Sequence, residues 1–219
     1  MFRRRKTAAP DDDAAEATSE GGETSADEAP TGTTGPWDVA DADFDPEDPD
    51  RIDLGSLVVR GSADVELRLQ VDEATQLVVA AMLVAENGAV ELRPFAAPRS
   101  EGIWESVRKE IAAEATRRGG TASEVDGAFG TELRIVVPMT GPDGRPGTQA
   151  SRVVGVDGPR WMLRATFLGQ PAIQTDPEGV LERAFRDVVV VRGPGPMPPS
   201  EALPLTMPSG ARPAAPEEL

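Results

Sequence analysis

Residues 65–93, VELRLQVDEATQLVVAAMLVAENGAVELR, hold three successive strand patterns. In residues 65–71 apolar and polar side chains alternate, as in a strand with one face exposed to water. Residues 75–85 are mainly apolar, which is typical of a central strand covered on both faces. Asn87-Gly88 separates this run from a second alternating one, and this dipeptide between two strand patterns is a strong hairpin signal. The segment therefore predicts neighbouring antiparallel strands.

The rest of the middle of the chain adds strands and two helices. Residues 101–118 predict a helix with Ser100 as its N-cap, because apolar side chains recur every three or four residues, at Ile103, Trp104, Val107, Ile111 and Ala115. Further strands are expected at residues 131–138, 149–156 and 160–168. Asp176 as N-cap and Pro177 at the first helical position predict a second helix.

The order strands, helix, strands, helix predicts an α+β fold. We expect a largely antiparallel sheet with two amphipathic helices packed on it, both on one face. This single domain is expected at residues 51–192, which is enough chain for one good hydrophobic core.

Composition separates two terminal segments from that domain. Residues 1–50 hold 15 acidic and 4 basic side chains, and residues 7–36 have no large apolar side chain, so we expect a disordered acidic N-terminal arm. Residues 193–219 contain eight prolines and predict an extended C-terminal tail. Within this tail Leu203, Leu205 and Met207 alternate, so it can lie against the edge of the domain.

The 219-residue chain contains no histidine, cysteine or tyrosine. This excludes histidine bases, cysteine nucleophiles, disulfides, and cysteine sites for zinc or iron–sulfur clusters. We therefore expect no catalytic residue, no metal and no cofactor. A carboxylate-dependent enzyme stays open as an alternative. It needs two acids that converge in a cleft with their pKa values pushed apart, and no pair stands out in the sequence.

No run of about 18 apolar residues is present, so no transmembrane helix is expected. The basic start Arg3-Arg4-Arg5-Lys6 is followed by acidic residues rather than by the apolar region of a signal peptide, which favours the cytoplasm. The formal net charge is −16, and 11 of these charges belong to residues 1–50. The predicted domain is therefore only weakly acidic, and the overall charge says little about its partners.

Six arginines lie on what we predict to be the solvent face of the sheet: Arg68, Arg93, Arg134, Arg152, Arg160 and Arg164. The planar guanidinium fork suits carboxylate and phosphate groups. One alternative is nucleic-acid or nucleotide binding, although single-stranded nucleic acid favours interleaved aromatics and only Trp161 is close. The other is an ordinary solvated face, neutralised by Glu66, Glu91 and Glu132 across the strands.

Trp37 and Phe44 interrupt the acidic arm. Spaced aromatics among acidic residues can form a short docking motif, or these side chains can fold back onto the edge of the domain. We interpret the chain as a non-enzymatic cytosolic binding or adaptor protein whose partner is another protein. The contact would use the arginine face, residues 37–44, or both. The sequence leaves the oligomeric state open.

Three segments resemble a known family: GPWDV at residues 35–39 with RIDLGSL at 51–57, Ile103-Trp104, and VDGPRWMLR at 156–164. The chain resembles an actinobacterial family of cytosolic proteins that has only a domain-of-unknown-function label. The resemblance covers roughly residues 37–207 and implies no activity and no site residues. The closing strand, turn and helix also resemble the end of Mog1/PsbP-like α/β domains, which implies a fold only.

Overall fold

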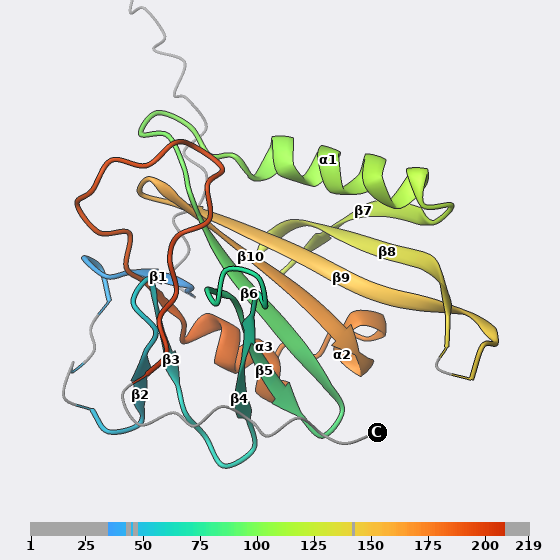
Figure 1. Ribbon diagram of the computed structural model, residues 1–219, viewed down its shortest axis with the longest axis horizontal. Coiled ribbons are helices and arrows are strands. Elements are labelled where there is room, and N and C mark those ends of the chain that lie inside the picture. The colour runs from blue at the N-terminus through green and yellow to red at the C-terminus, as the bar shows by residue number, and fades with distance from the viewer. Residues whose placement is uncertain (1–34, 43–44, 46–47, 142, 209–219) are drawn as a thin grey trace, which may run out of the picture. The chain divides into compact units, whose positions relative to one another are not determined.

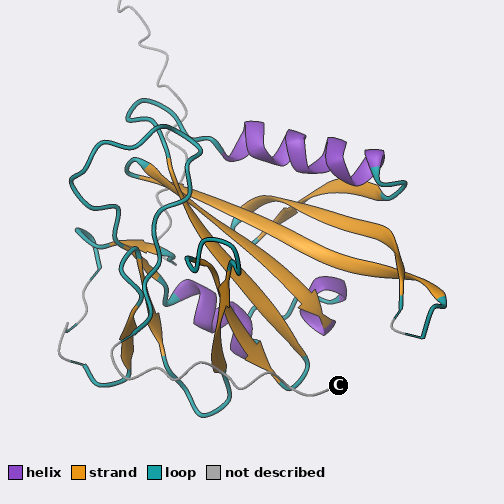
Figure 2. Ribbon diagram, viewed as in Figure 1, coloured by secondary structure: helices purple, strands orange, loops and turns teal. Residues whose placement is uncertain are grey.

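The computed structural model describes residues 35–42, 45, 48–141 and 143–208 (Figure 1). Phe44 and nearly all of the predicted disordered segment at residues 7–36 lie outside these ranges. Strands dominate the described chain, and three helices accompany them (Figure 2). Among the described residues, no helix combines the length and the apolar character needed to cross a membrane.

Two sheets build the fold. The larger is antiparallel and has seven strands, in the order β4 (Glu66–Val71), β5 (Val78–Ala85), β6 (Gly88–Ala96), β10 (Trp161–Gly169), β9 (Pro146–Gly158), β8 (Gly130–Thr140) and β7 (Thr121–Gly127). The smaller has the order β1 (Trp37–Asp38), β11 (Val189–Val190), β3 (Leu57–Arg60) and β2 (Arg51–Asp53), with β1 parallel to β11. The predicted α+β fold with a largely antiparallel sheet is confirmed.

The predicted hairpin at Asn87-Gly88 joins β5 to β6, but its turn lies one residue earlier. Ala85 pairs with Gly88, so Glu86 and Asn87 form the turn. Gly88 instead begins β6 beside β10, where a Cβ atom would come within 2.3 Å of the Leu168 carbonyl oxygen. The glycine is therefore needed for close strand packing rather than for the turn itself.

The helices lie on opposite faces of the large sheet, so the expectation of a single helical face is wrong. Helix α1 (Trp104–Arg117) packs on β7, β8 and β9. Helices α2 (Gln170–Ile173) and α3 (Val180–Arg186) cover the other face together with the smaller sheet. In β10, Met162 belongs to the core under α1 whereas Leu163 belongs to the core under α3. Both faces of the sheet are thus partly buried.

Helix α3 begins four residues after the predicted N-cap. The Asp176 side chain accepts a hydrogen bond from the Glu178 backbone N–H, 3.1 Å away, and so closes a turn instead. Gly179 then stands at the N-cap with an extended backbone, and the helix starts at Val180.

Helix α1 has a cap from a distant strand rather than from the predicted Ser100. Its N-cap residue is Ile103, which has no capping side chain of its own. Asp157 in β9 accepts hydrogen bonds from the backbone N–H groups of Ile103, at 2.9 Å, and Trp104, at 3.2 Å. These are two of the N–H groups that a helix leaves without intrahelical acceptors.

Replacing Asp157 with alanine is expected to lower the free energy of unfolding by about 1–2 kcal/mol, the usual effect of losing an N-cap. Urea denaturation monitored by circular dichroism measures this change. The matched control is Ser100→Ala, which should change stability by no more than about 0.5 kcal/mol. If Ser100→Ala lowers the free energy of unfolding more than Asp157→Ala does, Ser100 rather than Asp157 caps the helix.

Both flanks of the predicted 51–192 domain contribute to the fold. Trp37 and Asp38 pair with β11, and the Asp38 carboxylate accepts a hydrogen bond of 2.6 Å from the Trp161 indole N–H. In the C-terminal tail Leu203 and Leu205 are buried in the core, whereas Met207 is 46% exposed. The described fold therefore extends beyond both expected boundaries.

Candidate functional site

The structure divides the six predicted arginines among three places. Arg68, Arg93 and Arg164 share the face of the large sheet on which α1 lies, over strands that α1 does not cover. Arg134 and Arg152 point to the opposite face, toward α2 and α3. Arg160 lies in the turn between β9 and β10, where its backbone has a φ of 65°. A single six-arginine face does not form.

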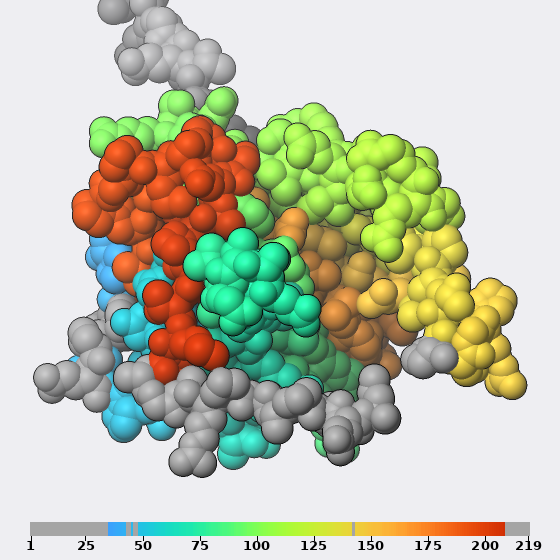
Figure 3. All heavy atoms as spheres, in the orientation of Figure 1, coloured from blue at the N-terminus to red at the C-terminus, as the bar shows by residue number. Residues whose placement is uncertain are grey.

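We define the open sheet face as Arg68, Glu91, Arg93, Phe95 and Arg164. In Figure 3 the surface is hollowed between α1 and the segment that joins β4 to β5. A groove of about 550 Å³ runs between α1 and this face. On the sheet side, Glu91 of β6 and Thr166 and Leu168 of β10 line the groove. The face is therefore accessible to a partner and is partly concave.

Arg164 is the distinctive residue of the open sheet face. It is directly opposite Arg93 across the β6–β10 pair, and its guanidinium lies over the Phe95 ring at 5.3 Å. Its Nε atom is buried and has no hydrogen-bond partner among the described residues. Burial, and then the like charge of Arg93, lower the pKa of Arg164 from its usual value. The charge of Glu91 acts on this pKa in the opposite direction, but no ion pair joins Arg164 to a carboxylate among the described residues.

The other two arginines of this face have carboxylate neighbours. Arg93 forms an ion pair with Glu91 at 2.9 Å and also donates to the Gln70 side chain. Arg68 pairs with Glu66 at 2.9 Å, and both of these side chains are largely exposed. The exposed Arg68–Glu66 pair contributes little to stability, whereas the Arg93–Glu91 pair is partly buried. An incoming anion would compete with Glu66 and Glu91 for these two arginines, but the buried Nε of Arg164 has no competing partner among the described residues.

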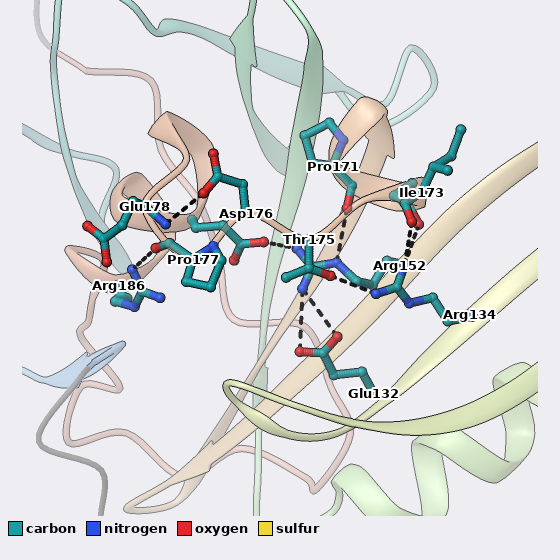
Figure 4. Close-up of polar contacts among 12 residues, drawn as sticks. Glu132, Arg134, Arg152, Pro171, Ile173, Thr175, Asp176, Pro177, Glu178 and Arg186 are labelled. Atoms are coloured by element: carbon teal, nitrogen blue, oxygen red, sulfur yellow. Dashed lines mark hydrogen bonds and ion pairs between the residues drawn. The ribbon is translucent and has the colours of Figure 1, made fainter.

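Arg152 was expected at the solvent face, and this is wrong because its side chain is 0% exposed. Its Nη1 donates to the Glu132 carboxylate at 3.2 Å and its Nε donates to the Pro171 carbonyl at 3.2 Å (Figure 4). Its Nη2 donates to Glu182. The guanidinium also lies 3.9 Å from the centre of the Phe167 ring. These contacts make a buried ionic network, which we call the Arg152 network.

Arg134 extends this arrangement to the end of α2. It lies directly opposite Arg152 on the neighbouring strand. Its Nη1 donates to the carbonyls of Ala172 and Ile173 at 3.0 Å, and its Nη2 donates to the Thr175 hydroxyl at 2.6 Å (Figure 4). Arginine often satisfies the free carbonyls at a helix C-terminus in this way. Arg134 is thus used within the fold.

Two further predicted residues also contact the fold, whereas Phe44 lies outside the described residues. Arg160 donates to the Gly193 carbonyl at 3.0 Å. Trp37 is partly buried, and its backbone N–H donates to the Val188 carbonyl at 2.9 Å. Sequence reasoning missed Phe95 and Glu182, whose importance depends on Arg164 and Arg152, residues distant from them in the chain.

Two acids do converge in this structure, which bears on the carboxylate-enzyme alternative. Glu132 and Glu182 are both buried and both bind Arg152. Burial is the main cause that raises the pKa of Glu182, and the Glu132 charge acts in the same direction. However, the pocket that Glu182 lines does not include Glu132 among its lining residues. The described residues also contain no group of three or more acids that could hold a metal ion.

One protein-family model matches most of the chain. The model described as "Protein of unknown function (DUF3710)" matches residues 35–214, most of the chain. The chain belongs to the DUF3710 family. This confirms the resemblance to a domain of unknown function. The DUF3710 match begins at Gly35, just before β1, and includes the buried part of the C-terminal tail, so it covers both flanks that the structure adds to the domain.

No curated protein matches the DUF3710 chain. Among solved structures, a crystal structure from Bacteroides thetaiotaomicron VPI-5482 at 1.50 Å resolution matches with 10% sequence identity and a TM-score of 0.38. The match covers 63% of the DUF3710 chain and 46% of that protein, so the chain spans about half of its length.

Proposed function

We propose that this chain is a non-enzymatic binding protein whose open sheet face receives an acidic segment of another protein. The observation that supports this most directly is the buried Nε of Arg164, which has no hydrogen-bond partner among the described residues and lies on a strand directly opposite a second arginine. A cytoplasmic location, expected from the sequence, is part of this proposal.

The chemistry of Arg164 favours a carboxylate partner. A guanidinium does not lose its proton in proteins, so burial cannot neutralise it. A carboxylate that reaches its free Nε would form a charge-assisted hydrogen bond at a site already partly shielded from water. Because Arg93 lies directly opposite on the next strand, an extended acidic segment can contact both arginines.

A protein segment suits this face better than nucleic acid does. Phe95 is the aromatic side chain of the face, and Arg164 already lies over it. Trp161, the aromatic considered for base stacking, is 1% exposed and belongs to the core on the opposite side of the sheet.

Binding of a fluorescein-labelled peptide of alternating glutamate and leucine tests this proposal by fluorescence anisotropy. Arg164→Gln is expected to weaken binding about tenfold, the usual effect of losing a hydrogen bond to a charged group. Arg145→Gln is the matched control, because Arg145 is 86% exposed in the loop between β8 and β9. This control should bind the peptide as the unchanged protein does.

Thermal denaturation of the same variants distinguishes a binding role from a structural one. Arg164→Gln should not lower Tm, since it removes an unpaired, partly buried charge. Equal weakening of peptide binding by both variants would indicate general charge attraction and contradict the proposal. Tighter binding of a single-stranded oligonucleotide than of the peptide would instead favour the nucleic-acid alternative.

A further inference from the structure

A small pocket lies on the opposite side of the large sheet from Arg164. It has a volume of about 170 Å³ and is bordered by the β5–β6 turn, α2, the loop after α2 and the first turn of α3. Its exposed rim carries Asn87, Gln170, Gln174 and Asp176. Its buried floor consists of Pro171, Leu181 and Glu182.

The floor of this pocket contains a carboxylate oxygen that lacks a partner. Glu182 is 2% exposed, and its Oε1 accepts a hydrogen bond from Arg152. Its Oε2 is buried and has no hydrogen-bond partner among the described residues. Buried polar atoms are almost always satisfied, so an unsatisfied one on a residue that lines a pocket indicates a position for a ligand donor.

The charge of the pocket wall indicates what kind of donor this is. Asp176 and Glu182 are the charged residues that line the pocket, and both are acidic. The three side-chain amides of the rim can accept as well as donate, and the Gln174 Oε1 already accepts a hydrogen bond of 3.2 Å from the Gln170 Nε2. Arg152 lies behind the floor, where it is fully occupied by Glu132, Pro171 and Glu182. A cationic N–H donor is therefore complementary to this wall.

We propose that this pocket binds a small organic cation with an ammonium or guanidinium head group that donates to Oε2 of Glu182. Drug-sized ligands occupy roughly 300–1,000 Å³, so this pocket accommodates a head group with a short substituent. Asp176 lies at the entrance, where its carboxylate also holds the backbone N–H of Glu178 (Figure 4). It contributes attraction at the rim.

The ionisation of Glu182 gives the binding a pH dependence. Burial raises the pKa of Glu182, Glu132 acts in the same direction, and the positive charges of Arg152 and Arg186 oppose them. Asp176 is the other ionisable group of the pocket wall. Only the ionised carboxylate attracts a cation, so binding releases a proton whenever Glu182 is protonated. Affinity should therefore decrease as the pH falls through the raised pKa.

The test is a titration of the ¹⁵N-labelled full chain with methylguanidinium chloride, followed by NMR of the side-chain amides of Asn87, Gln170 and Gln174. We expect saturable shifts of these signals. N-methylurea has nearly the same shape without the charge and should leave them unchanged. Titrations at several pH values should show weaker binding at lower pH.

Three single variants connect this response to the pocket. Glu182→Gln should weaken methylguanidinium binding about tenfold or more, and Asp176→Asn should weaken it about threefold, as expected for buried and exposed charged partners. Glu178→Gln is the matched control, because Glu178 is two residues from Asp176 in sequence but does not line the pocket. It should leave the affinity unchanged.

The proposal is overturned if the amide signals respond equally to methylguanidinium and N-methylurea, or do not saturate with either. It is also overturned if Glu178→Gln weakens binding as much as Asp176→Asn. Should Glu182→Gln fail to fold, Asp176→Asn and the pH profile decide the outcome. These results are independent of the open sheet face, because the two sites lie on opposite sides of the sheet.

Discussion

Arg152→Met is expected to lower the free energy of unfolding by about 3–5 kcal/mol, because it leaves two buried acids without their shared cation. Glu132 and Glu182 are 1% and 2% exposed, and Arg152 binds both. The Pro171 carbonyl would lose its donor as well. Chemical denaturation of the variant, monitored by tryptophan fluorescence, measures the change.

Two further variants identify the cause of this loss. Arg145→Met removes an exposed arginine and should change stability by no more than about 0.5 kcal/mol. The triple variant Arg152→Met, Glu132→Gln, Glu182→Gln should recover a large part of the loss, because it removes the uncompensated charges. If Arg152→Met is as stable as Arg145→Met, the Arg152 network does not stabilise the fold, which contradicts this prediction.

Trp104→Ala is expected to lower the free energy of unfolding by about 3–5 kcal/mol, the usual effect of removing a buried tryptophan. Trp104 is 6% exposed at the start of α1, and its indole N–H donates to the Thr131 carbonyl at 2.8 Å. It lies so close to Gly155 that a Cβ atom there would stand 2.1 Å from the ring. No smaller side chain fills this space between α1 and β9.

Trp104→Phe separates the apolar contribution of this residue from its hydrogen bond. Phenylalanine retains most of the ring but leaves the Thr131 carbonyl unpaired, so we expect a loss of about 1–3 kcal/mol. Urea titrations of both variants at one protein concentration compare the two losses. The packing argument is contradicted if Trp104→Phe destabilises the protein as much as Trp104→Ala.

Strands with an apolar face packed on a core could be predicted from the sequence. In β10, Trp161, Leu163 and Phe167 alternate with Arg164 and other residues, and all three are buried in one core. The predicted apolar stripe of the helix is also confirmed, since Ile103, Trp104 and Ala115 are buried in the core between α1 and the sheet. In both cases the apolar side chains recur with the period of the element, two residues in a strand and 3.6 in a helix, and so lie on the side that packs on the core.

The positions of the arginines could not be predicted, because alternation separates two faces without saying which face meets water. Arg134 does point away from Leu133 and Ile135, as its place in the strand requires. However, a second core with α2 and α3 covers that other face. A polar position in a sheet covered on both sides can therefore be solvated, as for Arg68, or buried, as for Arg152.

Strand β7 and the pocket around Glu182 have no hydrophobic periodicity that could predict them from the sequence. Strand β7 is a polar edge strand, TASEVDG, in which Ala122 packs against the core and most side chains are exposed. Its existence depends on backbone pairing with β8 rather than on hydrophobic alternation. The pocket around Glu182 could not be predicted either. Arg152 binds Glu182 in the floor of this pocket, but the two residues are 30 positions apart in the chain.

The order in which the ribosome makes the chain matters for the smaller sheet. Trp37 is synthesised early, yet its partner Val189 is 152 residues later, and Leu205 follows only after that. At about 5–20 residues per second, β1 waits roughly 8–30 s for β11 to be made. During this interval Leu54 and Leu57, which are completely buried in the finished protein, lack their C-terminal cover. We therefore expect this apolar surface of the nascent chain to stay exposed to water until residues 189–205 have been made.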